Sequence, residues 1–365
     1  MTSQRLQKQK VVWLAVQPTP YNLFLYQALQ QSEQLDFQFY YSMQQYELLP
    51  YEQNALPEGH SFFQKKWGLD GALLRRAFER RSIFVVAGWD EPTKLLTMIL
   101  RGLLGYPTAF WTDSVDSHKA KKEPYAKQWL KKWLLNHCQV VFTTGDFGVR
   151  QLKATGWIRD EQKIASLPYF TPLPLLFKQQ NILDNQCLKL LCVARLVSYK
   201  GIQVAIEAVG LLRDRGFSAE LKVCGIGPDE QVLRKQINEL NLEDRVFLIG
   251  WKNTADLQAL RLEANVLLHT VIEHEPYGLA VMESLAAGLP VVGSPLAGAV
   301  VDLVRDGENG WVVDARRPDE IAEKLVRLFE QPGLLTVFSQ QARAEMEKWP
   351  VVRGLKIIES QFISK

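Results

Sequence analysis

The sequence has few cysteines and no long apolar run, and each absence excludes a class of protein. Its 365 residues include four cysteines, with no C-x-x-C pair and no cluster of histidines beside them. That pattern argues against a structural zinc site and favours free thiols in a reducing cytosol. The longest apolar stretch, residues 95–106, contains Arg101 and is too short to cross a bilayer. We therefore expect a cytoplasmic protein, or one held peripherally on the inner face of the cell membrane.

The N-terminus also lacks a signal-peptide pattern, because only six apolar residues follow its basic start. We expect residues 11–16 to form a first strand instead. Apolar residues make up 47% of the chain and charged residues 23%, which is typical of a globular protein, and the length predicts two domains. Net charge is divided unevenly: residues 1–170 contain 21 Lys and Arg against 15 Asp and Glu, and the rest contain 22 against 25.

Short apolar runs alternate with helical patterns through most of the chain. This rhythm predicts an α/β fold of two doubly wound, Rossmann-like domains, each with a parallel sheet and helices on both faces, that face each other across a cleft. In the first half, the expected strands are residues 11–16, 36–43, 82–88, 108–113, 139–144 and 163–169.

The rhythm breaks at residues 171–187, which contain two prolines and a polar tract. We expect this segment to be a linker between one domain in residues 1–170 and a second in residues 188–334. Residues 335–365 have helical patterns only, and we expect these helices to pack back towards the N-terminal domain.

Ligands of open parallel sheets bind beyond the carboxyl ends of the strands, where helix N-termini point, so polar residues at those junctions are candidates for a site. Arg195 ends the first strand of the second domain, and Lys200 opens the next helix. Two cations beside a helix start suit a diphosphate, although a surface ion pair is the alternative. Gly225 and Gly227 then form a tight turn that either contacts a ligand or only allows close packing. The third glycine of the dinucleotide fingerprint is missing here.

The stretch EHEPYGLAVMESLAAGLPVV, residues 273–292, places carboxylates on both sides of an expected helix start. Glu283 lies inside the helix, where its carboxylate can accept two hydrogen bonds from a vicinal diol such as that of ribose. Glu275 precedes the helix, and the free amides near Gly278 and Leu279 suit a negative charge. The alternative is that both glutamates are solvated surface residues.

Four segments of the second domain together resemble the retaining glycosyltransferase family 4, also called glycosyl transferases group 1, whose members have the GT-B fold. They are ARLVSYKG, VCGIGPDE, EPYGLAVMESLAAGLPVV and AGAVVDLVRDGENGWVVD, in this order within residues 188–331. The most specific is the E-x7-E element from Glu275 to Glu283. It has a single register, because Val281 stands eight positions after Glu273.

The resemblance implies a role for each of these positions. Glu283 would bind the ribose hydroxyls of a nucleotide sugar. Arg195 and Lys200 would neutralise its diphosphate, which is the leaving group. Glu275 would contact hydroxyls of the donor sugar, and Trp251 would lie in the loop that borders the base.

Charge on a departing diphosphate is stabilised either by a metal or by fixed cations together with a helix N-terminus. The sequence has no Asp-x-Asp at a strand end, whereas it has Arg195, Lys200 and the helix start at Gly278. It therefore predicts an enzyme that needs no metal. The resemblance implies that it has no other cofactor either and that its donor is a UDP- or GDP-sugar.

The N-terminal domain, which the resemblance makes the acceptor side, departs from the family at its first turn. Many members have a glycine-rich turn there, but this chain has QPTPYNLF, whose Tyr21 can reach the cleft. Family members often keep a His or Asp near the end of the strand TAFWTD. Asp113, Asp116 and His118 are therefore candidates for binding or polarising the acceptor, with a loop cap or a surface position as the alternative for each.

Residues 119–135 combine six lysines with an apolar stripe made of Tyr125, Trp129, Leu130, Trp133 and Leu134. The pattern suits an anionic membrane surface and a lipid-linked acceptor. Alternatively, the stripe packs on the sheet as in an ordinary amphipathic helix, with or without lysines that face a membrane. No nucleic-acid-binding motif accompanies the basic residues, so we expect no nucleic acid partner.

Together these features predict a metal-independent glycosyltransferase, and the family resemblance implies that it is a retaining one. It would move a hexosyl group from a nucleoside diphosphate sugar to a hydroxyl of a glycan or lipid-linked saccharide, in cell-envelope or exopolysaccharide biosynthesis. Two alternatives stay open: a nucleotide-sugar epimerase of the same fold, and a catalytically silent sugar-nucleotide-binding subunit. An oxidoreductase is disfavoured because the dinucleotide fingerprint is incomplete.

Overall fold

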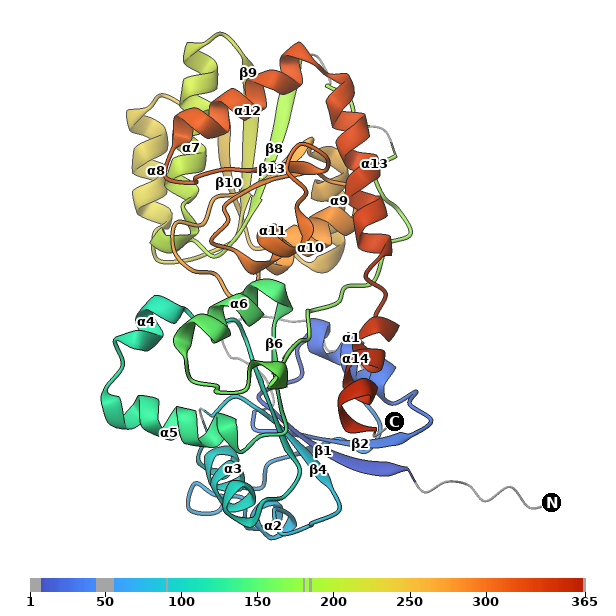
Figure 1. The fold of residues 1–365 in the computed structure, drawn as a ribbon. Coiled ribbons are helices and arrows are strands. Elements are labelled where there is room, and N and C mark those ends of the chain that lie inside the picture. The colour runs from blue at the N-terminus through green and yellow to red at the C-terminus, as the bar shows by residue number, and fades with distance from the viewer. Residues whose placement is uncertain (1–7, 44–55, 90, 180, 184–185, 364–365) are drawn as a thin grey trace, which may run out of the picture. The chain divides into compact units, whose positions relative to one another are not determined.

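The computed structural model describes residues 8–43, 56–89, 91–179, 181–183 and 186–363, and its contacts divide the chain into two compact units. The N-terminal unit consists of residues 1–170 and 350–365, and the C-terminal unit of residues 171–349. Each unit is a parallel sheet covered by helices (Figure 1). The predicted α/β fold with doubly wound parallel sheets is therefore confirmed.

The sheet of the N-terminal unit has the strand order β3-β2-β1-β4-β5-β6-β7 within the described residues, and all of its pairings are parallel. The central strand β4 and residues 11–15 of its neighbour β1 are apolar and buried on both faces, as expected for a sheet covered on both sides. The chain order reverses between β1 and β4, which makes this pair the switch point of the sheet. The strands are β1 (Gln9–Ala15), β2 (Leu35–Tyr41), β3 (Ser61–Phe62), β4 (Ile83–Ala87), β5 (Thr108–Thr112), β6 (Val140–Thr143) and β7 (Ile164–Ser166).

The helices of this unit are closed by ordinary caps. Asp70 caps α2, Glu91 caps α3, and Gly105 ends α3 in the left-handed conformation. The helices are α1 (Pro20–Leu29), α2 (Gly71–Arg76), α3 (Pro92–Leu104), α4 (Ser117–Lys121), α5 (Tyr125–Asn136), α6 (Gly145–Thr155) and α14 (Val352–Phe362), with a short 3-10 turn η1 (Glu161–Lys163).

The sheet of the C-terminal unit has the order β10-β9-β8-β11-β12-β13 within the described residues, again with parallel pairings. Here the chain order reverses between β8 and β11, so the switch point of this unit lies between these two strands. The strands are β8 (Cys187–Val193), β9 (Ser218–Cys224), β10 (Val246–Gly250), β11 (Val266–His269), β12 (Val291–Gly293) and β13 (Gly310–Val312).

The helices of the C-terminal unit pack their apolar faces on this sheet, and α7 and α12 contribute a large part of the core. They are η2 (Ser198–Lys200), α7 (Ile202–Asp214), α8 (Glu230–Glu239), α9 (Thr254–Glu263), α10 (Leu279–Ala286), α11 (Gly298–Leu303), α12 (Pro318–Glu330) and α13 (Gly333–Glu347).

The predicted C-terminal tail is divided between the two units, so the expectation for residues 335–365 was right only for its last helix. α13 packs against α10 and belongs to the C-terminal unit. α14 belongs to the N-terminal unit and packs beside α1 (Figure 1). Gly354 allows this close approach, because a Cβ there would lie 2.7 Å from both Leu25 Cδ1 and Phe170.

The expected linker, residues 171–187, is attached to the C-terminal unit rather than independent of it. The Asn181 side chain is fully buried and donates to the carbonyl of Asn265 at 2.8 Å. The Asn265 side chain donates in return to Oδ1 of Asn181 at 2.8 Å. Prolines and polar residues gave no periodic pattern from which this docking could be predicted.

The apolar stripe of α5 is only partly buried. Leu134 is buried in the core, and Leu130 and Trp133 pack against it. Tyr125 and Trp129 are instead 82% and 56% exposed. Packing on the sheet therefore accounts for only one end of the stripe. Within the described residues, no helix combines the length and apolar character needed to cross a lipid bilayer.

Candidate active site

The polar residues singled out in the C-terminal unit gather where β8 and β11 end, at its switch point. The loop after β8 carries Lys200, and the loop after β11 carries Glu275. Nζ of Lys200 donates a hydrogen bond of 2.5 Å to Oε1 of Glu275. Both side chains are nearly buried, at 10% and 12% exposed. The structure thus joins two residues for which the sequence suggested separate roles.

Backbone contacts hold both partners of this ion pair in place. Gly201 follows Lys200 in the left-handed conformation, and a Cβ there would overlap the carbonyl oxygen of Thr270. The Thr270 hydroxyl donates to the carbonyl of Gly201 at 2.9 Å. The Glu275 amide donates to the carbonyl of Leu296 at 2.9 Å, which fixes the loop after β11 against the loop after β12.

The Glu275 carboxylate stays ionised over the whole physiological range. Burial raises its pKa, but the contacts of His269 and Lys200 with the carboxylate outweigh burial and hold the pKa at about 2. Nε2 of His269 lies 3.5 Å from Oε2 of Glu275, which is long for a hydrogen bond. Sequence reasoning missed His269; its signal was a lone histidine at the end of the apolar strand NVLLHTV.

The start of α10 lies directly after these residues. Gly278 has φ +99°, and a Cβ there would lie 2.9 Å from Nε2 of His269, so glycine is required both for the backbone and for space. The first amides of a helix, here those around Leu279, have no acceptor within the helix. They give the site a partial positive charge beside the Lys200 ammonium.

Glu283 lies in α10 and binds a residue that the sequence did not reveal. The Arg261 guanidinium of α9 donates to Oε2 of Glu283. Arg261 is 5% exposed at its side chain, whereas the Glu283 side chain is 39% exposed. One carboxylate oxygen is therefore anchored while the side chain stays accessible to a ligand. The signal for Arg261 was a single basic residue in the apolar second half of TADLQALRLE.

Arg195 and Trp251 lie at the same edge of the sheet with exposed side chains. Arg195 follows β8 and donates from Nη2 to the Tyr199 hydroxyl at 3.0 Å. Trp251 follows β10 directly and is 44% exposed. Neither is held by a carboxylate among the described residues, so both can turn towards a ligand.

Gly225 and Gly227 have a packing role in the structure. A Cβ on Gly225 would overlap the carbonyl oxygen of Ala194, and one on Gly227 would overlap that of Leu196. The same loops are joined by the amide of Leu196, which donates to the carbonyl of Ile226 at 3.0 Å. The structure therefore shows the close packing that was one of the two alternatives for these glycines. Ligand contact by Gly225 stays a prediction.

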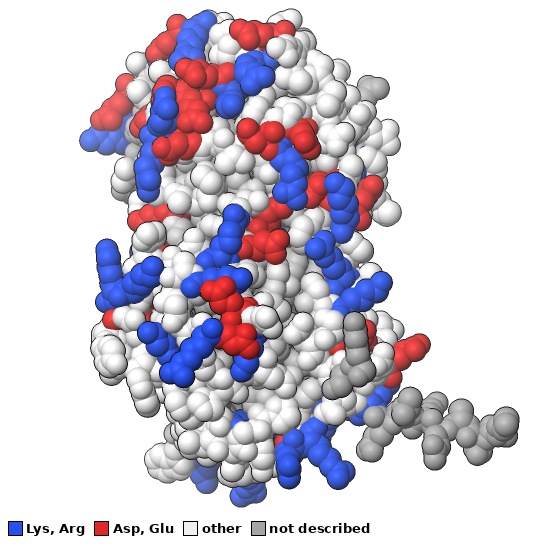
Figure 2. Space-filling model, in the orientation of Figure 1, with Lys and Arg blue, Asp and Glu red and all other residues white. Residues whose placement is uncertain are grey.

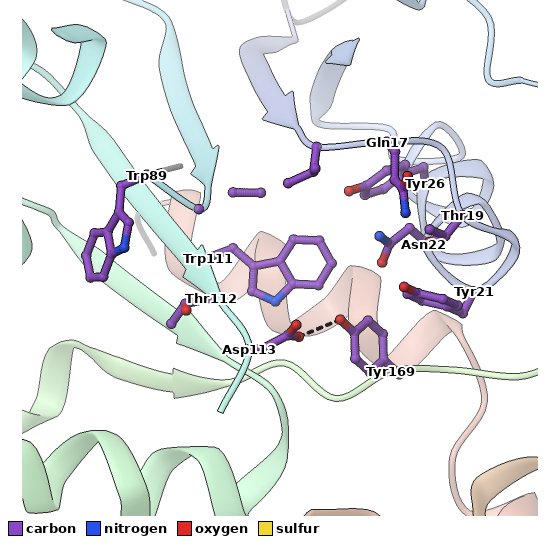
Figure 3. Close-up of a pocket in the computed structure, with 13 residues that line it drawn as sticks. Gln17, Thr19, Tyr21, Asn22, Tyr26, Trp89, Trp111, Thr112, Asp113 and Tyr169 are labelled. Atoms are coloured by element: carbon purple, nitrogen blue, oxygen red, sulfur yellow. Dashed lines mark hydrogen bonds between the residues drawn. The ribbon is translucent and has the colours of Figure 1, made fainter. Parts of the chain in front are cut away.

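The N-terminal unit contains a pocket of about 370 Å³ at its own switch point. Asp113 lies in its wall after β5, and Oδ1 accepts hydrogen bonds from the Tyr169 hydroxyl at 2.5 Å and the Thr144 hydroxyl at 3.1 Å. Figure 3 shows the Asp113–Tyr169 bond together with Tyr21, whose ring lies 4.8 Å from that of Tyr169. Burial, and then the Asp113 carboxylate, raise the pKa of Tyr169 well above its ordinary value, so this phenol donates.

Of the other acceptor candidates, Asp116 has the alternative role of a cap. Its Oδ1 accepts from the amides of His118 and Lys119 at 3.0 and 3.1 Å and so begins α4. The His118 side chain is exposed and does not line the pocket. The structure therefore brings Asp113 and Tyr21 together and leaves His118 apart.

A comparison with known protein families matches residues 176–345, nearly all of the C-terminal unit, to the family described as glycosyl transferases group 1. The C-terminal unit is thus similar to glycosyl transferases group 1 along nearly all of its length. The resemblance seen in the sequence is confirmed at the level of this family.

The curated relatives match over less than half of the chain. AmsK, an amylovoran biosynthesis glycosyltransferase of Erwinia amylovora, is 33% identical over 45% of this chain and 41% of its own length. WcaL of Escherichia coli strain K12, a glycosyltransferase named for colanic acid biosynthesis, is 35% identical over 38% of this chain and 35% of its own length. The chain thus spans less than half of these relatives.

Solved glycosyltransferase structures extend the likeness in fold to both units. HepE of Anabaena, crystallised with UDP, covers 96% of this chain and 98% of its own, with a TM-score of 0.73 and 16% identity. A glycosyltransferase from Rickettsia africae covers 99% of this chain and all of its own, with a TM-score of 0.74 and 13% identity. The two doubly wound units therefore have the GT-B fold.

Proposed function

We propose that this protein is a retaining glycosyltransferase that needs no metal. It moves a hexosyl group from a UDP- or GDP-sugar to a hydroxyl of a saccharide or lipid-linked acceptor. The observation that carries the proposal is the arrangement at the β8/β11 switch point, where the Lys200–Glu275 pair stands beside the start of α10 and Glu283 follows in the same helix. Cell-envelope or exopolysaccharide biosynthesis fits the names of the relatives AmsK and WcaL.

Each group has a task in this reaction. Glu283, anchored by Arg261, accepts hydrogen bonds from the ribose diol. Lys200, Arg195 and the amides at the start of α10 stabilise the charge that builds on the diphosphate as its bond to the sugar breaks. Because these charges are fixed before the reaction, a metal is not required in this scheme.

Retention follows if the acceptor hydroxyl attacks from the side that the diphosphate leaves. The bond between the sugar's anomeric carbon and the diphosphate oxygen breaks, the acceptor oxygen forms the new bond, and the acceptor proton passes to the departing phosphate. Glu275, held ionised by Lys200, then orients the hydroxyls of the donor sugar rather than transferring a proton.

A donor-hydrolysis screen tests the proposal. UDP-, GDP- and ADP-sugars are incubated with the protein with and without chelator, and release of the nucleoside diphosphate is measured. Glu283→Ala is expected to weaken nucleotide binding at least tenfold, and Glu273→Ala, an exposed residue of the same loop, is the matched control. Inhibition by chelator would contradict metal independence, and unchanged nucleotide binding in Glu283→Ala would contradict the ribose role.

We also propose that α4 and α5 hold the N-terminal unit on an anionic membrane at the cytoplasmic face. Tyr125 and Trp129 project from α5 without core contacts that bury them, and Lys121 and Lys122 have no carboxylate partner within the described residues. Figure 2 shows basic side chains over α4 beside uncharged surface over α5. Aromatic rings next to lysines suit the headgroup region of an anionic bilayer.

Liposome flotation tests this surface. The protein is expected to float with phosphatidylglycerol vesicles at low salt and not with phosphatidylcholine vesicles. Lys121→Glu with Lys122→Glu is expected to abolish flotation, whereas Lys235→Glu on the C-terminal unit leaves it unchanged. Equal flotation with both lipids, or none at low salt, would contradict the proposal.

A further inference from the structure

Several polar side-chain atoms in the wall of the N-terminal pocket have no hydrogen-bond partner among the described residues. The lining residues come from the loop between β1 and α1 and from the ends of β4 and β5 (Figure 3). Five of them carry a buried polar atom without a hydrogen-bond partner among the described residues: Gln17 Oε1, Thr19 Oγ1, Asn22 Oδ1, the Tyr26 hydroxyl and Trp111 Nε1. Trp111 is only 5% exposed and Thr19 only 1%.

Such an arrangement is costly unless something binds there. Each buried polar atom without a partner costs about 1–3 kcal/mol. The five residues that carry these atoms line one space of about 370 Å³, which is within the usual range for a small-molecule site of about 300–1,000 Å³. A ligand with several hydroxyl groups satisfies the amide oxygens of Gln17 and Asn22 as a donor and the Trp111 indole N–H as an acceptor.

The charge of the wall decides the class of ligand. Among the described lining residues Asp113 is the one that carries a charge, and no Lys, Arg or His lines the pocket. A phosphate or carboxylate would meet this carboxylate without a compensating cation. An uncharged hydroxyl can instead donate to Asp113, whose Oδ1 already accepts from Tyr169 and Thr144.

The shape of the wall indicates a ring. The rings of Trp111, Tyr21 and Tyr169 contribute to the lining (Figure 3). The Tyr169 ring lies 6.2 Å from that of Trp111 and 4.8 Å from that of Tyr21. A pyranose has an apolar C–H face that packs on such rings and hydroxyls at its rim that reach the polar atoms.

We propose that this pocket binds an uncharged pyranose and excludes phosphorylated sugars. The proposal rests on the glycosyltransferase function proposed above and makes this pyranose the end of the acceptor. It follows that the acceptor presents a neutral sugar residue to the N-terminal unit, and any phosphate that the acceptor carries lies outside the pocket.

Fluorine NMR of protein labelled with 5-fluorotryptophan tests the proposal, with the Trp111 resonance assigned from Trp111→Phe. The probes are the methyl glycosides of glucose, galactose and N-acetylglucosamine, compared with glucose 1-phosphate. We expect at least one methyl glycoside to shift the Trp111 resonance and to bind at least tenfold more tightly than glucose 1-phosphate. Asn22→Leu is expected to weaken that binding about tenfold, and Gln31→Leu, an exposed position beyond α1, is the matched control.

A second variant reverses the selectivity. Asn22→Lys places a cation in the wall and is expected to create glucose 1-phosphate binding while it weakens glycoside binding. UDP binding, measured by calorimetry on the same samples, reports the C-terminal unit independently. Glycosides that leave Trp111 unshifted in protein that binds UDP would overturn the pyranose pocket alone, as would glucose 1-phosphate binding as tightly as the glycosides. Loss of both glycoside and UDP binding in the wild type would overturn the proposed function as well.

Discussion

Lys200 and Glu275 are 75 positions apart in the chain, yet their side chains form a nearly buried ion pair of 2.5 Å. They meet because β8 and β11 are neighbours at the point where the strand order of the sheet reverses. At such a point the loops after two adjacent strands diverge and leave room for a ligand. The pair therefore marks the place in the C-terminal unit where we propose that the diphosphate of the donor binds.

The ionised Glu275 makes stability depend on pH in a defined direction. Its pKa is about 2 in the folded protein against 4.5 in the unfolded chain, so its contribution is complete above pH 4.5 and is lost as pH falls towards 2. This contribution is on the order of 3 kcal/mol. Urea unfolding at pH 7, 5, 4 and 3 is expected to show that the stability advantage of wild type over Glu275→Gln shrinks below pH 4.5. A constant difference from pH 7 to pH 3 would contradict the assigned pKa.

Arg261 is predicted to position Glu283 for the nucleotide. Arg261→Met removes the guanidinium that holds Oε2 of Glu283, so UDP affinity is expected to fall about tenfold. Arg261→Lys keeps the charge without the planar fork and is expected to have an intermediate effect. Calorimetric titration with UDP measures this, with the exposed Arg215→Met as control. UDP affinity that stays at the wild-type value in Arg261→Met would show that Glu283 needs no anchor.

Gly201 and Gly216 have similar backbone angles but different surroundings. Alanine variants of the two therefore distinguish the cost of a steric overlap from the cost of a left-handed backbone. Gly201 and Gly216 have φ +64° and +81°, but a Cβ would overlap the Thr270 carbonyl at Gly201 and meets nothing within 4 Å at Gly216. Gly216→Ala is expected to lower the free energy of unfolding by about 1 kcal/mol, as a left-handed alanine does. Gly201→Ala is expected to cost at least about 3 kcal/mol, because the backbone beside Lys200 must move. Equal losses in chemical denaturation would argue against the tight contact.

Arg101 is predicted to be the largest single polar contribution to the N-terminal unit. Its guanidinium is fully buried and donates to the carbonyls of Ala77, Ser82 and Pro107. Burial lowers its pKa to about 10, so it stays charged at pH 7. Arg101→Met leaves these carbonyls without donors and is expected to cost about 3–5 kcal/mol. Thermal unfolding measures the loss, and the exposed Arg75→Met is expected to change stability by less than about 0.5 kcal/mol.

The sequence by itself determined the fold class and the kind of domain. Buried parallel strands are continuous apolar runs, and the helices between them repeat every 3.6 residues, so both periods are visible in one chain. The E-x7-E spacing from Glu275 to Glu283 is likewise local, since both residues lie around one helix start. The two-residue strand β3 was not predicted, because two residues do not make a recognisable apolar run.

The tertiary structure alone decided which side chains meet. The Arg261–Glu283 and Lys200–Glu275 pairs depend on which strands are neighbours in the sheet. The spacing of apolar residues along the chain does not predict that strand order. The same holds for α13, whose apolar face suits either unit by pattern and is matched by α10 in the C-terminal unit. In the N-terminal unit, Gln17 and Trp111 became candidate site residues only when the ends of β1 and β5 brought their unpartnered polar atoms to one pocket.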